Sequence, residues 1–417
     1  MKKTIKLAVV AALALGTTSA FATNGSTLIG VGAKSRGMAG VGIGMGHGAE
    51  SALVNPALIT TIEKDHEVSF GGTVFMPNVS TEITNSAAGS LGKETSAANM
   101  NVIPAVSIAN KVNDNFYWGI GIWGTAGMGV DYRDSALTTG NMQMVTNLQL
   151  MQFGLPLAYT TNGFSIGLTP VLQYGALDIN YNNSGTSVGT GVAQDLEFGF
   201  NVGLAYEIEG ITIGATYKSQ IDMKYKGVLS TVTQPFATMG VFPAPMEDKL
   251  STPAEMGIGA SYNMGEHTVA IDYKNIKWSD AKGYKEFGWD DQNVVTVGYE
   301  YATKTWAARL GYNYASNPIS DAGAQPISAY AGDPAIFGGN ALNMFNLLGF
   351  PATVESHIAV GGTYAFDEVM SVDLAYVYGL QSTTTLATMP DLGTGTDNET
   401  EVKHSQNSVS VQLNYAF

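Results

Sequence analysis

The chain has 417 residues, no cysteine, 13% charged residues and a formal net charge of −15. Soluble domains carry about 25% charged residues, so this chain has too few charges to cover an ordinary soluble surface of its size. The lack of cysteine excludes disulfide cross-links and lipid attachment through a thiol. The strongly acidic balance excludes a typical nucleic-acid-binding protein, so we expect no nucleic acid among its partners.

The first residues have the features of an export signal. An uninterrupted apolar run from Leu7 to Leu15 follows a lysine-rich start and precedes Ala20-Phe21-Ala22. This run is too short to cross a membrane as a helix, which needs about 20 residues. The pattern predicts a signal peptide over residues 1–22, cleaved after Ala22.

Residues 23–62, called the N-terminal segment below, show no strand-like alternation. They contain a glycine-rich stretch from Asn24 to Gly48, followed by Ser51 to Thr60. Small apolar residues, turn-forming glycines and few basic residues favour a compact fold over a solvated tail. We therefore expect this segment to pack against the rest of the protein.

From His66 onward, fourteen segments alternate apolar and polar residues, which is the pattern of a strand with one apolar face. Their expected ranges are 66–77, 101–111, 116–124, 147–160, 164–180, 195–208, 211–226, 254–263, 267–278, 292–302, 305–315, 355–366, 369–380 and 406–417. Short turns alternate with long connections along the chain. The long connections include 125–146, 227–253, 316–354 and 381–405.

The last strand illustrates the alternation. One parity holds the apolar residues Val409, Val411, Leu413, Tyr415 and Phe417, and the other holds Ser408, Ser410, Gln412 and Asn414. In the seventh and eleventh strands the basic residues Lys218, Lys224 and Arg309 lie on the polar parity. A basic side chain facing lipid costs about 2 to 4 kcal/mol at the bilayer midplane, so we expect these three to face the interior of a barrel.

Together these patterns predict an all-β membrane protein, a 14-stranded antiparallel transmembrane β-barrel over residues 63–417 with an N-terminal hatch (residues 23–62) inside its lumen. Strands in hydrocarbon must have every backbone group paired, which requires a closed sheet. Short turns on the periplasmic side and long loops outside are typical of such barrels. Most segments also reach the 9 to 11 residues that a tilted membrane strand needs.

Several motifs resemble one family. They are Arg36-Gly37-Met38-Ala39-Gly40, Asn55-Pro56-Ala57-Leu58-Ile59-Thr60, Thr216-Tyr217-Lys218-Ser219, Pro253-Ala254-Glu255-Met256, Gly362-Thr363-Tyr364-Ala365-Phe366 and Asn414-Tyr415-Ala416-Phe417. The chain resembles the FadL/TodX/OmpP family of outer-membrane transporters of long-chain fatty acids and hydrocarbons, over essentially its whole mature length. The resemblance implies a fourteen-stranded barrel plugged by an N-terminal hatch, in the outer membrane of a Gram-negative bacterium. It assigns Asn55, Pro56 and Ala57 to the hatch.

Two long loops are rich in apolar residues. The first carries Phe236, Met239 and Phe242, and the second carries Ile336, Phe337, Phe345, Leu348 and Phe350. Apolar loops outside the cell need cover or a ligand. They can pack only on each other to cap the barrel, or they can form the substrate groove that the resemblance implies, and both interpretations stay open.

The interior lysines and arginine are candidates for binding a carboxylate. Lys218, Lys224 and Arg309 could each give a fatty acid a charge-assisted hydrogen bond, although solvation or pairing with nearby acids is the more common role for any one such residue. The fifth strand departs from the fatty-acid members, because no Lys or Arg occurs from Gly163 to Asn180. Neutral or aromatic hydrocarbons therefore remain an alternative substrate.

The third strand is the candidate for the inward kink that opens the barrel wall in this family. It carries Gly119, Gly121, Gly124 and Gly127, and glycine weakens strands and permits bends. We expect passive uptake of a long-chain fatty acid or related hydrophobic compound through a loop groove, an inner pocket and a lateral exit controlled by the hatch.

The sequence predicts no enzyme, cofactor or metal site. Its five histidines do not occur at metal-ligand spacing, and Gly163 to Gly167 matches a nucleophile-elbow pattern only at the start of a strand. Expected partners are the hydrophobic substrate, outer-membrane lipids and lipopolysaccharide, and the barrel assembly machinery through the strand that ends at Phe417, with the protein a monomer. A general water-filled porin and a surface adhesin or antigen remain alternatives.

Overall fold

We describe a computed structural model of the chain. The structure describes residues 23–86, 88–137, 141–183, 185–238, 246–322, 334–388 and 398–417, with the side chains of residues 238 and 334–338 left out. The predicted signal peptide, residues 1–22, lies outside the described residues.

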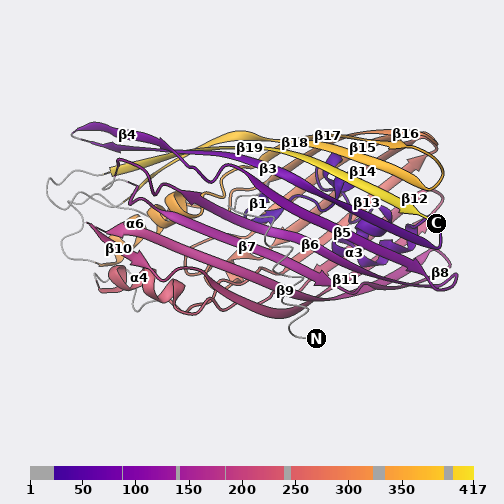
Figure 1. The fold of residues 1–417 in the computed structure, drawn as a ribbon, viewed down its shortest axis with the longest axis horizontal. Coiled ribbons are helices and arrows are strands. Elements are labelled where there is room, and N and C mark those ends of the chain that lie inside the picture. Colours follow the sequence, from indigo (N-terminus) through magenta and orange to yellow (C-terminus); the bar gives the residue numbers. More distant parts are fainter. Residues whose placement is uncertain are drawn as a thin grey trace.

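Fourteen antiparallel strands form a closed barrel (Figure 1), as the sequence predicts. The spanning strands are β3 (His66–Asn85), β5 (Asn101–Lys111), β6 (Phe116–Asp131), β7 (Val145–Gly154) continued by β8 (Leu157–Thr161), β9 (Phe164–Asn183), β11 (Ala193–Ile208), β12 (Ile211–Lys218), β13 (Glu255–Met264), β14 (His267–Ile276), β15 (Gln292–Ala302), β16 (Trp306–Ala315), β17 (Ser356–Ala365), β18 (Met370–Ala387) and β19 (Asn398–Ala416). The short strands β4 (Gly89–Thr95) and β10 (Thr186–Gly189) extend two hairpins beyond the barrel. The last strand, β19, pairs with the first, β3, along its whole length and closes the sheet.

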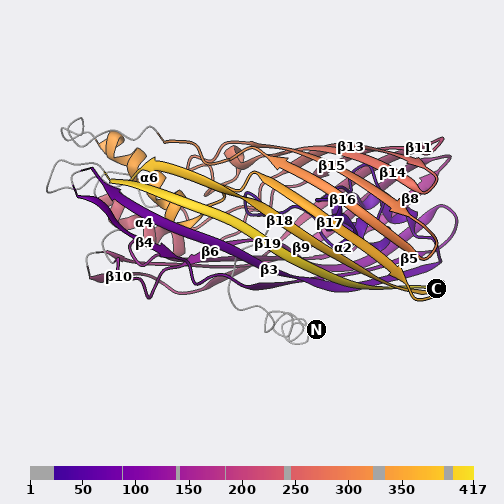
Figure 2. The ribbon, with the colours of Figure 1, turned by 90° about the horizontal axis from the view of Figure 1, so that it is seen from above.

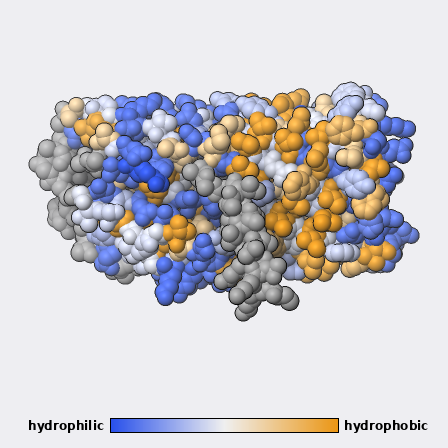
Figure 3. All heavy atoms as spheres, in the orientation of Figure 1, coloured by the Kyte–Doolittle hydropathy of each residue, from blue (hydrophilic) through white to orange (hydrophobic). Residues whose placement is uncertain are grey.

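The barrel turns its apolar side chains outward and its polar side chains inward. Phe198, Ile258 and Leu310 are 78%, 62% and 56% exposed, whereas Asn201 and Asn313 are buried. The last strand follows the same rule, because its apolar parity is exposed and its serine and amide parity is buried. Figure 3 shows the apolar side chains gathered over the half of the barrel nearer the C-terminus, where they form a surface suited to lipid.

The two ends of the barrel differ. Tight turns join the strands at the end that holds the C-terminus, and long connections lie at the other end, which is therefore the extracellular one. The helices α4 (Val228–Thr238) and α6 (Pro334–Gly349) lie at this extracellular end (Figures 1 and 2). In the described part of the chain, no helix has both the length and the apolar character to cross a bilayer.

The N-terminal segment lies inside the outline of the barrel in both ribbon views (Figures 1 and 2). It folds into the short elements β1 (Thr23–Asn24), β2 (Thr27–Leu28), α2 (Ala33–Gly37), η1 (Gly48–Glu50), α3 (Ser51–Val54) and η2 (Pro56–Thr61). Almost all its residues are buried. The Arg36 guanidinium illustrates its contacts with the wall, since it donates to the hydroxyls of Ser408 and Ser410 at 2.6 and 3.1 Å.

The prediction for the seventh strand is wrong beyond Lys218. β12 ends there, and the next apolar residues, Ile221, Met223 and Tyr225, are buried in the interior instead of facing lipid. The chain bends inward at Ser219, whose N–H donates to Phe200 O at 2.9 Å while its hydroxyl accepts from Phe200 N at 3.0 Å. The two faces are therefore reversed after the bend, and Lys224 is exposed on the side opposite the buried Met223 and Tyr225.

Candidate functional site

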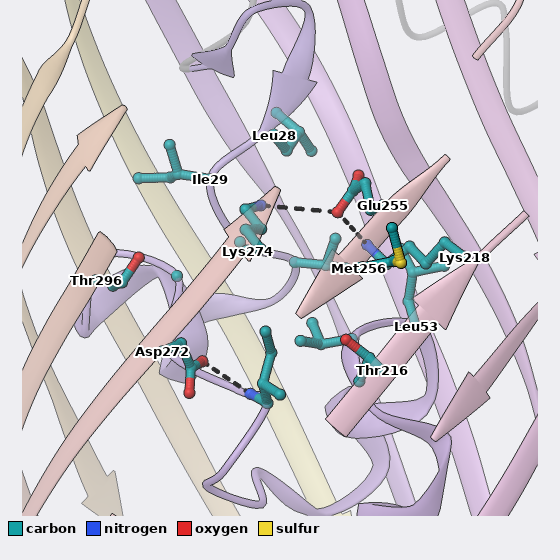
Figure 4. A pocket seen from close by; sticks show the side chains of 15 residues that line it. Leu28, Ile29, Leu53, Thr216, Lys218, Glu255, Met256, Asp272, Lys274 and Thr296 are labelled. Atoms are coloured by element: carbon teal, nitrogen blue, oxygen red, sulfur yellow. Dashed lines mark hydrogen bonds and ion pairs between the residues drawn. The ribbon is translucent and has the colours of Figure 1, made fainter. Parts of the chain in front are cut away.

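A pocket lies between the N-terminal segment and the barrel wall formed by β12 to β15 (Figure 4). Its cavity volume is about 40 Å³, and part of the pocket is open to solvent. The N-terminal segment contributes mainly apolar side chains to it, namely Leu28, Ile29, Val31, Ile43, Leu53 and Val54. The wall contributes Met256 and otherwise polar and charged side chains, namely Thr216, Lys218, Glu255, Asp272, Lys274 and Thr296.

Two lysines on the wall share one carboxylate. Lys218 Nζ lies 3.3 Å and Lys274 Nζ 3.9 Å from Oε2 of Glu255. All three side chains are mostly buried, and Figure 4 shows them gathered on one side of the pocket. The two ammonium groups carry two positive charges and the carboxylate carries one negative charge, so the charges at this site favour binding of a second anion.

Lys274 was not among the residues singled out from the sequence. The signal was present, because Asp272 and Lys274 alternate with the lipid-facing Ile271 and Tyr273 along β14. The sequence alone does not show the strand pairing. In the structure β14 lies beside β13 and β13 lies beside β12, which places Lys274 near Glu255 and Lys218.

Asp272 holds the N-terminal segment against the wall. Its Oδ2 accepts hydrogen bonds from the N–H groups of Gly42 and Ile43 at 2.7 and 2.8 Å, and its Oδ1 accepts from Gly44 N–H at 3.2 Å. On the neighbouring strand, the Ser261 hydroxyl donates to Gly44 O at 2.7 Å. A Cβ on Gly44 would lie 2.3 Å from Ala260 N, so only glycine permits this approach.

The Asn55-Pro56-Ala57 motif forms a second attachment. The Asn55 amide donates to Ile43 O at 2.8 Å within the segment and to Leu204 O of the wall at 3.1 Å. Its Oδ1 accepts from Ala57 N–H at 3.1 Å and caps η2. The wall makes room with Gly203, where a Cβ would lie 2.0 Å from Asn55 Oδ1.

Arg309 faces the lumen but is fully engaged by neighbouring residues. Its Nε lies 2.6 Å from Glu300 Oε2, and its Nη1 lies 3.6 Å from Asp373 Oδ1 and donates to Thr363 Oγ1 at 2.7 Å. A guanidinium that already meets two carboxylates has little capacity for a third. Of the three predicted carboxylate-binding residues, only Lys218 lines the pocket.

The apolar residues of the extracellular loops pack on one another. Phe236 and Phe345 lie 4.9 Å apart between ring centroids and both contact Tyr181. Leu348 and Phe350 are likewise buried in this cluster. Met239 and Phe242, and the side chains of Ile336 and Phe337, lie outside the described residues.

The third spanning strand, β6, separates from its neighbour β5. Their pairing ends at Ala105 and Trp123, and a bulge at Thr125 follows, where β6 has one residue more than β7. Beyond it β6 pairs with the N-terminal segment, through Ala126 with Thr27 and through Gly127 N–H with Ser26 O at 3.0 Å.

The four glycines predicted to form a kink differ in their surroundings. Gly124 lies at the point of separation. Gly119 and Gly121 lie in the paired part of β6, where a Cβ would meet Ile108 O at 2.1 Å or the Trp123 ring at 1.7 Å. Gly127 lies beyond the bulge, against the N-terminal segment.

A lipid-facing closed barrel whose interior holds a folded segment and a pocket with an apolar and a cationic side defines a membrane channel for hydrophobic compounds. The family model described as "Outer membrane protein transport protein (OMPP1/FadL/TodX)" matches residues 8–337. The chain belongs to this family and is an outer-membrane protein of the Gram-negative type.

Individual relatives agree with this assignment. The chain is 24% identical over 404 residues to the long-chain fatty acid transport protein of Shigella flexneri, covering 81% of this chain and 85% of the relative. It is 23% identical over 459 residues to outer membrane protein P1 of Haemophilus influenzae, covering 90% and 93%.

Two solved structures share the fold. A FadL homologue of Pseudomonas aeruginosa aligns with a TM-score of 0.68 at 16% identity, covering 94% of this chain and 100% of that one. The toluene transporter TodX of P. putida aligns with a TM-score of 0.65 at 17% identity, covering 93% and 99%.

Proposed function

We propose that the protein takes up long-chain fatty acids passively across the outer membrane, binding them in the pocket between the N-terminal segment and β12 to β15. The observation that carries this proposal is the pairing of an apolar side with two lysines that share one glutamate. Each methylene buried on the apolar side contributes about 0.8 kcal/mol. The carboxylate would be placed between Lys218 and Lys274, where charge-assisted hydrogen bonds favour an acid.

The route begins at the extracellular end and leaves sideways. The substrate first partitions into the apolar cluster of α4 and α6, which has to loosen because Phe236 and Phe345 are buried in it. From the pocket it leaves through the wall between β5 and β6, where strand pairing stops. The N-terminal segment acts as the hatch, since it occupies the lumen and pairs with β6 beyond Thr125.

The test is uptake of labelled oleate by proteoliposomes that carry the Lys218→Ala/Lys274→Ala double variant. We expect uptake of oleate to fall about tenfold, while uptake of methyl oleate, which has the same chain and no charge, stays within twofold. Equal losses for both ligands, or no loss for either, would contradict the proposed role of the lysines. Lys111→Ala, at a periplasmic turn where Lys111 pairs with Asp114 at 2.8 Å, is the control.

A second candidate substrate is a neutral aromatic hydrocarbon. It is favoured by β9, which has no Lys or Arg on its lumenal face and presents Thr169 and Gln173 there. It is also favoured by the fold shared with a toluene transporter. Uptake of labelled toluene that exceeds that of oleate, and does not respond to the double variant, would support this candidate. Uptake of small sugars at comparable rates would instead indicate a general porin.

A further inference from the structure

The N–H groups of Gly42, Ile43 and Gly44 converge on one point of the barrel wall. Three successive backbone donors aimed at a single place form an anion-binding site, often called a nest. Here the anion is a side chain of the protein itself, because the Asp272 carboxylate accepts all three hydrogen bonds at 2.7 to 3.2 Å. Asp272 is 4% exposed, so the bonds form away from bulk water, where they contribute most.

This internal anion lies at the same pocket as the two lysines. Asp272, Lys274 and Ile43 all line it, and Figure 4 shows Asp272 bonded to the N-terminal segment on one side of the space that Lys274 and Lys218 border on the other. Asp272 and Lys274 are two residues apart on one face of β14, about 7 Å along the strand. A displaced Asp272 therefore has a cation within reach.

We propose that Asp272 is an exchangeable internal ligand that latches residues 42–44 to the wall, and that a substrate carboxylate competes with it for the three N–H groups. The incoming carboxylate is drawn to the pocket by Lys218 and Lys274, takes hydrogen bonds from the nest, and leaves Asp272 to pair with Lys274. The N-terminal segment then loses its attachment to β14. This inference rests on the proposed function, because it requires a carboxylate substrate in this pocket.

The latch should respond differently to uncharged ligands and to a change at Asp272. An ester or hydrocarbon can fill the apolar side but cannot replace a carboxylate at three N–H donors, so it leaves the latch closed. Replacing Asp272 with Asn removes the charge and turns one acceptor into a donor that faces N–H groups, so it opens the latch without any ligand. Hydrogen bonds to a charged group contribute enough for an opening of tenfold or more.

The experiment measures how fast a thiol reagent labels Ile43→Cys from the periplasmic side. The chain has no cysteine of its own, and Ile43 is 4% exposed, so this position reports the detachment of residues 42–44. We expect saturating oleate to raise the labelling rate at least tenfold and methyl oleate to leave it within twofold. In the Ile43→Cys/Asp272→Asn variant the rate should be high without ligand and should not rise further with oleate.

The control variant is Asp222→Asn, because Asp222 pairs with Lys282 at 2.8 Å at the extracellular end, away from the N-terminal segment. It should label as slowly as the parent.

If methyl oleate accelerates labelling as much as oleate, or if Asp272→Asn labels as slowly as Asp222→Asn, the latch is wrong while the uptake function stands. If the parent takes up no oleate in the uptake assay, the proposed function fails whatever the labelling rates are. The comparison of oleate with methyl oleate needs no variant at Asp272, so it remains informative if Asp272→Asn does not fold.

Discussion

Charged residues in the lumen divide into those that support the wall and those that are available to a ligand. Arg309 belongs to the first group, because it is enclosed by Glu300 and Asp373. Lys218 and Lys274 belong to the second, because they share Glu255 at the edge of the pocket. The residue type alone does not separate the two groups, since all three side chains point into the same lumen.

This distinction predicts different consequences for Arg309→Ala and Lys218→Ala. Removing Arg309 leaves two buried carboxylates without their cation, which costs about 3 to 5 kcal/mol, whereas Lys218→Ala leaves Glu255 with Lys274. We expect the first variant to unfold at a clearly lower temperature in detergent, measured by heat-modified gel migration, with oleate uptake per folded barrel preserved. The opposite pattern, a stable barrel that no longer distinguishes oleate from methyl oleate, would make Arg309 a ligand-binding residue.

Glu50 of the N-terminal segment should make docking of this segment depend on pH. Burial raises the pKa of its carboxyl from the ordinary 4.5 to about 8. Its Oε2 accepts a hydrogen bond from Lys34 N–H at 3.3 Å, and the Gln412 amide donates to its Oε1. Because the docked state binds this proton more tightly than the free segment does, docking is most stable below about pH 4.5 and weakens as the pH rises towards 8.

A spin label at Thr61→Cys, an exposed position at the end of the segment, measures this effect. Its mobility should increase between pH 5 and pH 8, and the Glu50→Gln variant should stay immobile over the whole range. If Glu50→Gln shows the same pH response as the parent, another group is responsible.

At the scale of single elements, the bulge at Thr125 lies where β6 separates from β5. Two residues, Gly124 and Thr125, oppose one residue of β7, which bends the strand and ends its pairing with β5. Deleting Thr125 removes the extra residue. Ala126, Met128 and Val130 already face the lumen, and they still do so after the deletion because the strand then alternates without interruption.

We therefore expect deletion of Thr125 to extend the β5–β6 pairing, close the lateral route and lower oleate uptake at least tenfold, with the barrel still folded. Thr125→Ala, which keeps the bulge, should transport normally. Unchanged uptake after the deletion would show that the substrate does not leave between β5 and β6.

The strands were predictable from the sequence because lipid imposes a strict alternation. The ranges 101–111 and 292–302 agree with β5 and β15 in full, and most other ends agree to within three residues. The extensions of β3, β18 and β19 beyond the membrane were missed, since polar strands outside lipid lose the alternating signal. Residues 221–225 kept the alternation while turning inward, and the bend at Ser219 depends on a hydrogen bond to Phe200 in another strand.

The site was less predictable. The sequence contains Lys218 and the Asn55 motif, but the hydrogen bonds of Asp272 to residues 42–44 join positions about 230 residues apart. A glycine-rich segment has no side-chain pattern from which its contacts with particular strands can be predicted. The sequence therefore indicates that the N-terminal segment is compact, but it cannot indicate where the segment is attached.

For the whole molecule, we propose that the N-terminal segment determines what kind of channel the barrel forms. A fourteen-stranded barrel emptied of residues 23–62 would hold water, and it should then pass small sugars as a porin does. We expect the deletion variant, with residues 1–22 retained, to swell liposomes in arabinose and to lose the preference for oleate over methyl oleate. Selective uptake of oleate by this variant would mean that the segment is not a hatch.

The most direct test of the account is a crystal structure of the protein soaked with a long-chain fatty acid that carries bromine at its terminal carbon. We expect a carboxylate within hydrogen-bond distance of Lys218 or Lys274 and an anomalous bromine peak among the apolar side chains of the N-terminal segment, such as Leu28 and Leu53. A lumen in which the acid binds elsewhere, with Glu255, Asp272 and the two lysines paired as they are now, would contradict it.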